Sequence, residues 1–331
     1  MAELAGVSLS TVSRVVNQQA GVRADVRSRV WQVIEETGYR PNLAARALAS
    51  NRSGVISLVI PHVFSTLFTD PYFPRLIKGI SLACNKNDLS LSLFLFHSED
   101  EEKRLTRRIA NTSIVDGVII ASTQFDDPLI PHLIANRVPL VVIGRQDQYP
   151  EVNFVDIDNE AGAYTATIHL LRRNYQRVAH ISGPQNMVSG VDRLVGYRRA
   201  LRDRGYAYRE ELVVEGDYSE AGGYAAMRQL LAAQPEAVFV ASDPMALGAY
   251  RAIREAGLQI PEDIALVGFD DLLPPNSIQP RLTTIRQPVV QTGQEAVNLL
   301  MDIIENGPSP PNRIILDTKL VIRESCGSGA R

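Results

Sequence analysis

From Gly54 onward, short runs of β-branched and aliphatic residues alternate with amphipathic stretches of helical period. Of all the features of the sequence, this alternation limits the possible fold classes most, because it is typical of parallel sheets covered by helices on both faces. The predicted strands are Val55–Ile60, Leu89–Phe96, Val118–Ala121, Leu140–Ile143, Val178–Ile181, Ala237–Ala241 and Ile264–Phe269. The predicted helices are Phe73–Lys86, Glu99–Asn111, Glu160–Arg173, Asp192–Arg204, Ala221–Ala233 and Met245–Ala256.

Roughly ten strands over about 270 residues fit two packed units better than one. We expect the chain to pass between the units near Phe154–Asp158 and to return near Leu282–Pro288 and again around Leu316–Leu320.

The first residues predict a helix-turn-helix. Gly6 interrupts a short apolar helix, and Ser8 stands where an N-cap belongs. Behind it, Val12, Val15 and Val16 share one helical face, whereas small polar side chains and one arginine point elsewhere. Such a helix suits the floor of a major groove. An ordinary helical hairpin is the alternative for a pattern this short.

A third helix is predicted over Ala24–Thr37, with an apolar stripe of valines and Ile34 and with Gly38 as its stop. Pro41 and Asn42 then precede eight strong helix formers at residues 43–50. Eight residues are too few for a stable isolated helix. We therefore expect this segment to be helical only when something holds it.

Charge is distributed unevenly along the chain. The net charge is −3, yet residues 1–52 hold seven Arg against four acidic residues, so the head carries +3 and the remainder −6. A basic head on an acidic body is the layout of a protein that touches DNA with one end. The two cysteines and the lack of a leader or an apolar span predict a cytoplasmic protein.

A ligand site is predicted beyond the carboxyl ends of the strands, where doubly wound sheets bind their ligands. The side chains expected there are Asp70, Tyr72, Phe73, Thr123, Arg145, Arg193, Tyr218, Ser242, Asp243, Asp270 and Asp271. This mixture suits a small polyhydroxylated ligand, with rings against apolar sugar faces and charged groups on hydroxyls. Asp270 and Asp271 should not act as a pair, because neighbouring strand residues point to opposite faces.

The motifs of catalysis and cofactor binding are missing. The sequence has no phosphate-binding glycine motif, no metal-ligand spacing and no histidine placed to activate a nucleophile. We therefore expect neither an enzyme nor a cofactor.

Ordered motifs resemble the LacI/GalR family of bacterial transcription regulators. The matching strings are AELAGVSLSTVSRVVN, GYRPNLAARAL, VISLVIP, DPYF, VDGVI, VDIDNEAG, HISGP, RLVGYRRAL, ASDPMALGAYRAI, IALVGFDDL, RLTTIRQP and IRES. The resemblance implies a small all-α helix-turn-helix head and an α/β body of two doubly wound parallel-sheet subdomains like periplasmic binding proteins. It covers nearly the whole chain.

The resemblance also implies roles for individual residues. In the recognition helix, Leu9, Ser10 and Arg14 match positions that read base edges, and Ser8, Thr11, Ser13 and Asn17 match positions that hold phosphates. Residues 43–50 match the family's hinge helix, in which Leu48 is the minor-groove wedge, and Asn42 and Ala45 complete the DNA-contacting set. The positions that match the effector cleft are Tyr72, Phe73, Arg193, Tyr218, Ser242 and Asp270, and we add Thr123 and Arg145 from the strand ends.

This sequence departs from the family at two positions. Met1 stands at the last position of the usual lead into the first helix, which leaves about one turn; either the true start lies upstream or the head is less stable than usual. Ser242 replaces an Asn found in many members, which changes the expected ligand geometry. The C-terminus has no heptad extension, so a dimer is expected.

These features predict a dimeric, sequence-specific DNA-binding regulator, expected to be a repressor of carbohydrate-utilisation genes with a sugar as effector. Its predicted parts are residues 1–40 (head), 41–53 (hinge) and 54–331 (body, subdomains about 54–156 with 286–316 and 157–284 with 317–331). A purine or nucleoside effector is the alternative within the family. A solute-binding protein without a DNA role is the more distant alternative.

Overall fold

The computed structural model describes residues 1–16, 20–38, 52–60, 70–96, 98–110, 114–121, 124–274, 277–307 and 310–327. It divides into two compact units, Met1–Gly54 and Val55–Arg331, which are the head and the body. The predicted hinge helix at residues 43–50 lies outside the described residues.

The head contains three helices, α1 (Ala2–Ala5), α2 (Leu9–Val16) and α3 (Ala24–Thr37). Gly6 ends α1 with a φ of 61°, a left-handed conformation that glycine adopts without strain. Ser8 Oγ accepts a hydrogen bond from the Thr11 backbone N–H at 3.1 Å, as predicted for an N-cap. The first helix is a single turn, as the sequence indicated.

One small core holds the head together. Val12 and Val15 of α2 pack with Val30, Val33 and Ile34 of α3. The predicted valine stripe of α2 therefore faces inward, and the polar side of α2 is left at the surface.

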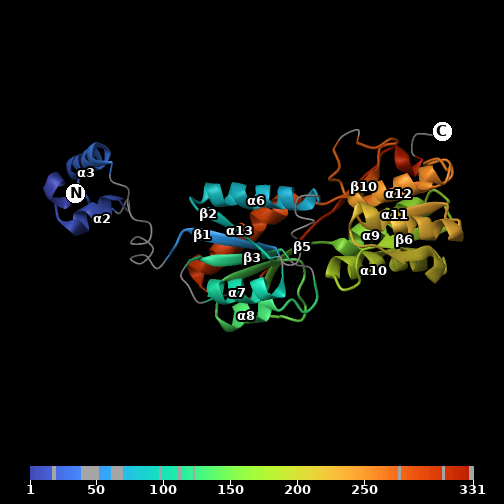
Figure 1. The fold of residues 1–331 in the computed structure, drawn as a ribbon, viewed down its shortest axis with the longest axis horizontal. Helices are drawn as coiled ribbons and strands as arrows, with labels where there is room; N and C mark the ends of the chain where they lie inside the picture. The colour runs from blue at the N-terminus through green and yellow to red at the C-terminus, as the bar shows by residue number, and fades with distance from the viewer. Residues whose placement is uncertain are drawn as a thin grey trace. The chain divides into compact units, whose positions relative to one another are not determined.

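The body has two lobes, each a sheet between helices (Figure 1). The sheet of the N-lobe has the order β11-β5-β4-β3-β1-β2, and all of its pairings are parallel. Helices α6 and α13 lie on one face of this sheet, and α7 and α8 lie on the other (Figure 1). The bounds in the N-lobe are β1 Val55–Ile60, α6 Tyr72–Lys86, β2 Ser90–Leu95, α7 Glu99–Ala110, β3 Gly117–Ala121, α8 Leu129–Ala135, β4 Leu140–Ile143, β5 Asn153–Ile157, α13 Val289–Asn306 and β11 Arg313–Leu316.

The sheet of the C-lobe has the order β12-β10-β9-β8-β6-β7, in which β12 alone among the described strands runs antiparallel to its neighbour. Helices α9 and α10 pack together, as do α11 and α12. The bounds in the C-lobe are α9 Asn159–Leu171, β6 Val178–Ser182, α10 Val188–Asp203, β7 Val213–Glu215, α11 Glu220–Leu230, β8 Ala237–Val240, α12 Asp243–Glu255, β9 Ala265–Asp270, β10 Thr283–Arg286 and β12 Lys319–Val321.

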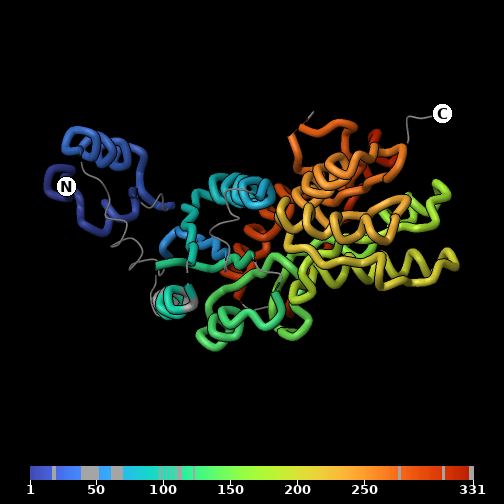
Figure 2. The backbone as a smooth tube through the Cα atoms, turned by 45° about the vertical axis from the view of Figure 1, so that its right-hand side comes forward, coloured from blue at the N-terminus to red at the C-terminus, as the bar shows by residue number. Residues whose placement is uncertain are grey.

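The chain passes from one lobe to the other after β5, after β10 and after β11 (Figure 2). These passages lie at the positions expected from the sequence. Since each strand that leads out of a lobe ends at the same edge of its sheet, they bring the carboxyl ends of the two sheets together.

The predicted helices do not include α8 or α13, and the predicted start of α10, Asp192, lies four residues after its actual start at Val188. The predicted strands do not include β5, β7, β10, β11 and β12. Thr292 and Gly293 lower the helix propensity of the α13 segment. Packing explains why it is helical nonetheless: α13 lies against α6 so closely that a Cβ on Gly293 would come within 2.7 Å of the Leu76 carbonyl oxygen. Gly293 weakens the helix because it has no side chain, and the same lack of a side chain permits the close contact with α6.

Candidate functional site

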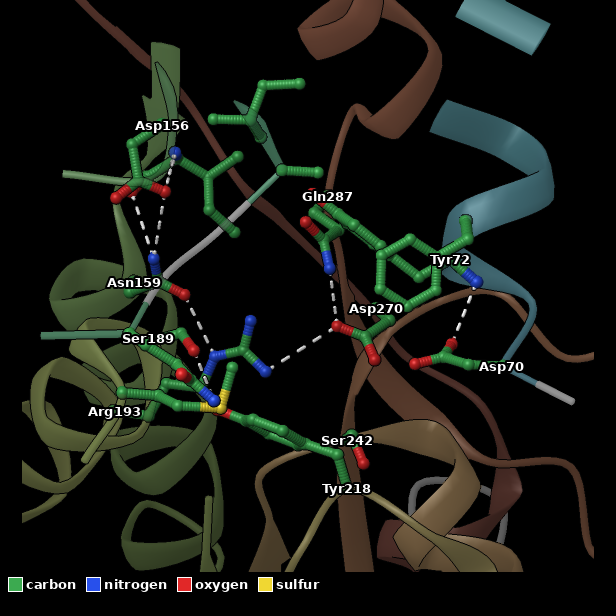
Figure 3. Close-up of a pocket in the computed structure, with 16 residues that line it drawn as sticks. Asp70, Tyr72, Asp156, Asn159, Ser189, Arg193, Tyr218, Ser242, Asp270 and Gln287 are labelled. Atoms are coloured by element: carbon green, nitrogen blue, oxygen red, sulfur yellow. Dashed lines mark hydrogen bonds and ion pairs between the residues drawn. The ribbon is translucent and has the colours of Figure 1, made fainter. Parts of the chain in front are cut away.

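A cavity of about 150 Å³ lies between the lobes of the body, where the strands of both sheets end. This volume exceeds the space that one water needs by about tenfold, so a small organic ligand fits. The lining side chains come from both lobes (Figure 3): Asp70, Tyr72, Phe73, Ala121, Gln124, Ile143, Asp156, Ile157, Asn159, Met187, Ser189, Arg193, Tyr218, Ser242, Asp270 and Gln287.

Arg193 of α10 occupies the middle of the cavity wall and is only 5% exposed. Its Nε donates to Asn159 Oδ1 at 2.9 Å, and Nη1 lies 3.6 Å from Asp270 Oδ1 and donates to the Ala241 carbonyl. The guanidinium carbon lies 3.7 Å from the centre of the Phe269 ring. These contacts hold the guanidinium of Arg193 in one orientation. They also offset the free-energy cost of burying its charge.

Three carboxyl groups line the same cavity. Burial raises the pKa of Asp270 well above its ordinary value, although Arg193 opposes the shift. Burial also raises the pKa of Asp156 to about 6 and raises the pKa of Asp70. Gln287 Nε2 donates to Asp270 Oδ1 at 2.6 Å (Figure 3). The cavity thus has three carboxyl groups to one arginine and offers many hydrogen-bond acceptors.

Aromatic rings complete the wall. Tyr72 and Phe73 meet edge to face, with centroids 5.4 Å apart. The Tyr218 hydroxyl lies 2.9 Å from Ser189 Oγ, and burial raises the pKa of this phenol, so it stays neutral. Gly183 is required beside it, because a Cβ there would collide with the Tyr218 ring.

The structure brings together most of the residues predicted for the effector site. Tyr72, Phe73, Arg193, Tyr218, Ser242 and Asp270 all line the cavity, whereas Thr123 lies outside the described residues. The lining set does not include Arg145, whose guanidinium instead pairs with Asp147 and Asp192.

Besides lining the cavity, Ser242 caps α12, because its Oγ accepts a hydrogen bond from the Met245 N–H at 3.3 Å. Asp271 turns away from Asp270, as predicted, and pairs with Arg286 and Arg323 at 2.6 Å each. Hydrogen bonds from these arginines outweigh burial and lower the pKa of Asp271.

Asp70, which the strand-end rule predicted, also lines the cavity. The sequence did not predict several other lining residues: Gln124, Asp156, Asn159, Met187, Ser189 and Gln287. Asp156 and Asn159 stand inside the string VDIDNEAG, at the passage between the lobes, and that position is the signal that could have identified them.

The polar side of α2 is the candidate DNA surface in the head. Ser8, Ser10, Ser13 and Arg14 are exposed, and the Leu9 side chain is 79% exposed. Thr11 is half-buried beside Ser8, with the two hydroxyls 2.8 Å apart. The remaining predicted contacts lie outside the described residues: Asn17, Asn42, Ala45 and Leu48.

Comparisons with known proteins match both units. Residues 1–42 match the model of bacterial regulatory proteins of the lacI family, and residues 167–326 match the periplasmic binding protein-like domain. The HTH-type transcriptional regulator CelR of Thermobifida fusca is 41% identical over 329 residues, which cover 98% of this chain and 96% of CelR.

Two solved structures support the same assignment. One is a transcriptional regulator CelR–cellobiose complex, with a TM-score of 0.80, 39% identity and 98% of each chain covered. The other is the lac repressor dimer bound to operator and the anti-inducer ONPF, with a TM-score of 0.85 and 30% identity over 98% of this chain and 97% of the repressor.

A helix-turn-helix head on a two-lobed body with a polar cavity defines a ligand-responsive, sequence-specific DNA-binding transcription regulator. The chain belongs to the lacI family of bacterial regulatory proteins. It is therefore a regulator and not an enzyme.

Within the described residues, no cluster of His, Cys, Asp or Glu could hold a metal ion. None of the helices in that part of the chain is long and apolar enough to cross a membrane.

Proposed function

We propose that this protein is a cytoplasmic homodimeric repressor of carbohydrate-utilisation genes, and that a neutral sugar bound between its lobes changes its affinity for a near-palindromic operator. The observation that carries the proposal is the lining of the cavity: one arginine and three carboxyl groups face aromatic rings. The solved complex of the CelR regulator with cellobiose supports a carbohydrate as the effector.

A neutral sugar fits this lining because each hydroxyl group can both donate and accept hydrogen bonds. Asp156 and Asp270 offer acceptors, Arg193 and Asn159 offer donors, and an aromatic ring can lie against the apolar C–H face of a pyranose. An anionic ligand fits poorly. Arg193 is already engaged by Asp270, and further carboxylates would repel a phosphate.

A purine or nucleoside is the second candidate, favoured by the rings of Phe73 and Tyr218, both of which line the cavity. A flat base would stack on them with its edges against the same polar groups. The two candidates differ in where their hydrogen-bonding groups lie, which a binding assay separates.

On the DNA side, we assign Leu9, Ser10 and Arg14 to base edges, and Ser8, Thr11 and Ser13 to phosphates. Exposure of the polar side of α2 supports this assignment. The segment of residues 43–50 would form a minor-groove helix whose spacing in the dimer depends on how the lobes are arranged. A ligand can shift that equilibrium only if it binds the two arrangements with different affinities. The lac repressor, a structural relative, is a dimer on its operator.

The test is a thermal-shift and calorimetric comparison of cellobiose, glucose, adenine and guanosine on the purified protein. A ligand present at 100 times its dissociation constant stabilises the folded state by about 2.7 kcal/mol. The proposal expects stabilisation by a sugar in the native protein and none in Asp270→Ala. Stabilisation by the purines alone would establish the second candidate, and equal stabilisation of Asp270→Ala would show that the sugar binds elsewhere.

A further inference from the structure

Two sets of contacts join the lobes beside the cavity, and their chemistry differs. At the end near Tyr72, Leu272 of the C-lobe is 2% exposed and packs within the apolar core of the N-lobe. Arg75 of α6 adds hydrogen bonds to the carbonyl oxygens of Asp271 (3.2 Å) and Leu272 (2.9 Å). This end is held by a buried apolar side chain.

The end near Asp156 is held by polar contacts. Arg145, just after β4 of the N-lobe, pairs with Asp192 of α10 in the C-lobe at 2.5 Å, and these side chains are 36% and 16% exposed. A backbone contact also joins the lobes, in which the Phe125 N–H donates to the Asn186 carbonyl at 3.1 Å. Asp156 and Tyr72 lie on opposite sides of the cavity (Figure 3). The two sets of contacts therefore flank it.

Arg145 is also tied to the cavity wall. Its backbone N–H donates to Asp156 Oδ2 at 2.8 Å, and its ion-pair partner Asp192 directly precedes Arg193. The ion pair thus links the element that carries Asp156 in one lobe to the helix that carries Arg193 in the other. Arg145 thus contacts residues of both walls without lining the cavity itself.

We propose that the Arg145–Asp192 pair is a positioning clasp, which holds the lobes closed at one end of the cavity, and that the lobes open by pivoting around Leu272. Separating the lobes at Leu272 would expose a buried leucine to water, whereas separating Arg145 from Asp192 exchanges a partly exposed ion pair for hydration. The second step costs much less, so opening begins at the clasp. The effect of the clasp on ligand dissociation rests on the proposed function, whereas its effect on the distance between the lobes does not.

The first test measures the ligand-free protein by double electron–electron resonance. Spin labels at Asn136→Cys and Arg204→Cys report the distance between the lobes, and the native Cys84 and Cys326 are buried. Arg145→Gln should add a population at longer distance, and Arg145→Lys should keep the native distribution. A native distribution in Arg145→Gln would overturn the proposal.

A matched control comes from the same helix. Arg199→Gln removes an ion pair to Glu160 (2.9 Å) that lies wholly within the C-lobe. It should leave the distance distribution unchanged. If Arg199→Gln broadens the distribution as much as Arg145→Gln does, the effect is general loosening and the clasp is refuted.

The second test uses cellobiose as the probe and measures its dissociation rate by stopped flow. Arg145→Gln and Asp192→Asn should each raise the rate about two- to fivefold, and the double variant no further, because a partly exposed pair contributes that much. The difference from the native protein should shrink in high salt. Additive effects of the two substitutions would contradict the clasp. If cellobiose does not bind the native protein, the proposed effector fails, while the spin-label distances still decide the clasp.

Discussion

Replacing Arg193 by methionine tests whether this buried cation and Asp270 depend on each other. The substitution keeps most of the apolar stem and removes the charge that lies 3.6 Å from Asp270 Oδ1. It also removes the donor to Asn159 Oδ1 at 2.9 Å. Breaking a buried ion pair from one side costs about 3–5 kcal/mol, since it leaves an uncompensated group in place. We expect a loss of that size in the free energy of unfolding, measured by urea denaturation.

Two variants control this experiment. Arg199→Met on the same helix breaks an exposed pair to Glu160 and should leave the free energy of unfolding nearly unchanged. Arg193→Met combined with Asp270→Asn should recover much of the loss, because the neutral amide needs no counter-charge and can still accept from Gln287. The reasoning is refuted if Arg193→Met costs no more than Arg199→Met, or if adding Asp270→Asn makes the protein less stable still.

The Arg193→Met variant should also be more sensitive to pH. Burial raises the pKa of Asp270 in the folded state, and the loss of Arg193 raises it further. An acid whose folded pKa is raised contributes stability that is fully present below its unfolded pKa and is lost as pH rises through the folded pKa. Below the folded pKa of Asp270 in the native protein, both proteins should lose stability alike as pH rises. Above it, the variant should keep losing stability up to its own, higher folded pKa, whereas the native protein levels off.

Three further predictions concern the body and the head. Burial raises the pKa of Asp243 to about 7, so the contribution of Asp243 to stability should fall as pH rises from about 4 through 7. Asp243→Asn should therefore flatten the pH dependence of the free energy of unfolding, measured in urea. An unchanged curve would exclude Asp243 as the source of that pH dependence. Arg14→Ala should weaken binding to a selected operator by roughly 1–3 kcal/mol; equal losses on operator and random DNA, measured by fluorescence anisotropy, would reassign Arg14 to a phosphate. Leu48→Ala should reduce operator affinity and DNA bending together in a gel-shift bending assay, and unchanged bending would remove the wedge role.

Much of the fold follows from local sequence pattern. The alternating strand and helix patterns predicted the two-sheet α/β body, because burial on both faces gives parallel strands continuous apolar runs. Helix α13 escaped prediction because Gly293 and the β-branched residues near its start act against a helix in isolation. The close approach of α6 explains why a glycine stands there, and this tertiary contact cannot be read from the local sequence.

The site was predictable only in part, for a related reason. Asp270 is the last residue of β9 and Tyr218 stands three residues after the end of β7, so the topology was enough to place both at the cavity. Gln287 reaches it from the passage between the lobes, which a strand-end rule does not cover. Arg145 also stands at a strand end, yet its guanidinium is drawn to Asp192, 47 positions away in the chain. The direction of a long side chain depends on partners that sequence spacing does not reveal.

The central claim is that a neutral sugar in the interlobe cavity changes affinity for DNA. It is tested most directly by fluorescence anisotropy on an operator selected by the protein from random DNA, titrated with and without saturating cellobiose. The account predicts that cellobiose changes the operator dissociation constant of the native protein by at least about fivefold, the lower end of ordinary allosteric coupling, and leaves Asp270→Ala unchanged. Cellobiose that binds the native cavity yet leaves operator affinity unaltered would contradict it.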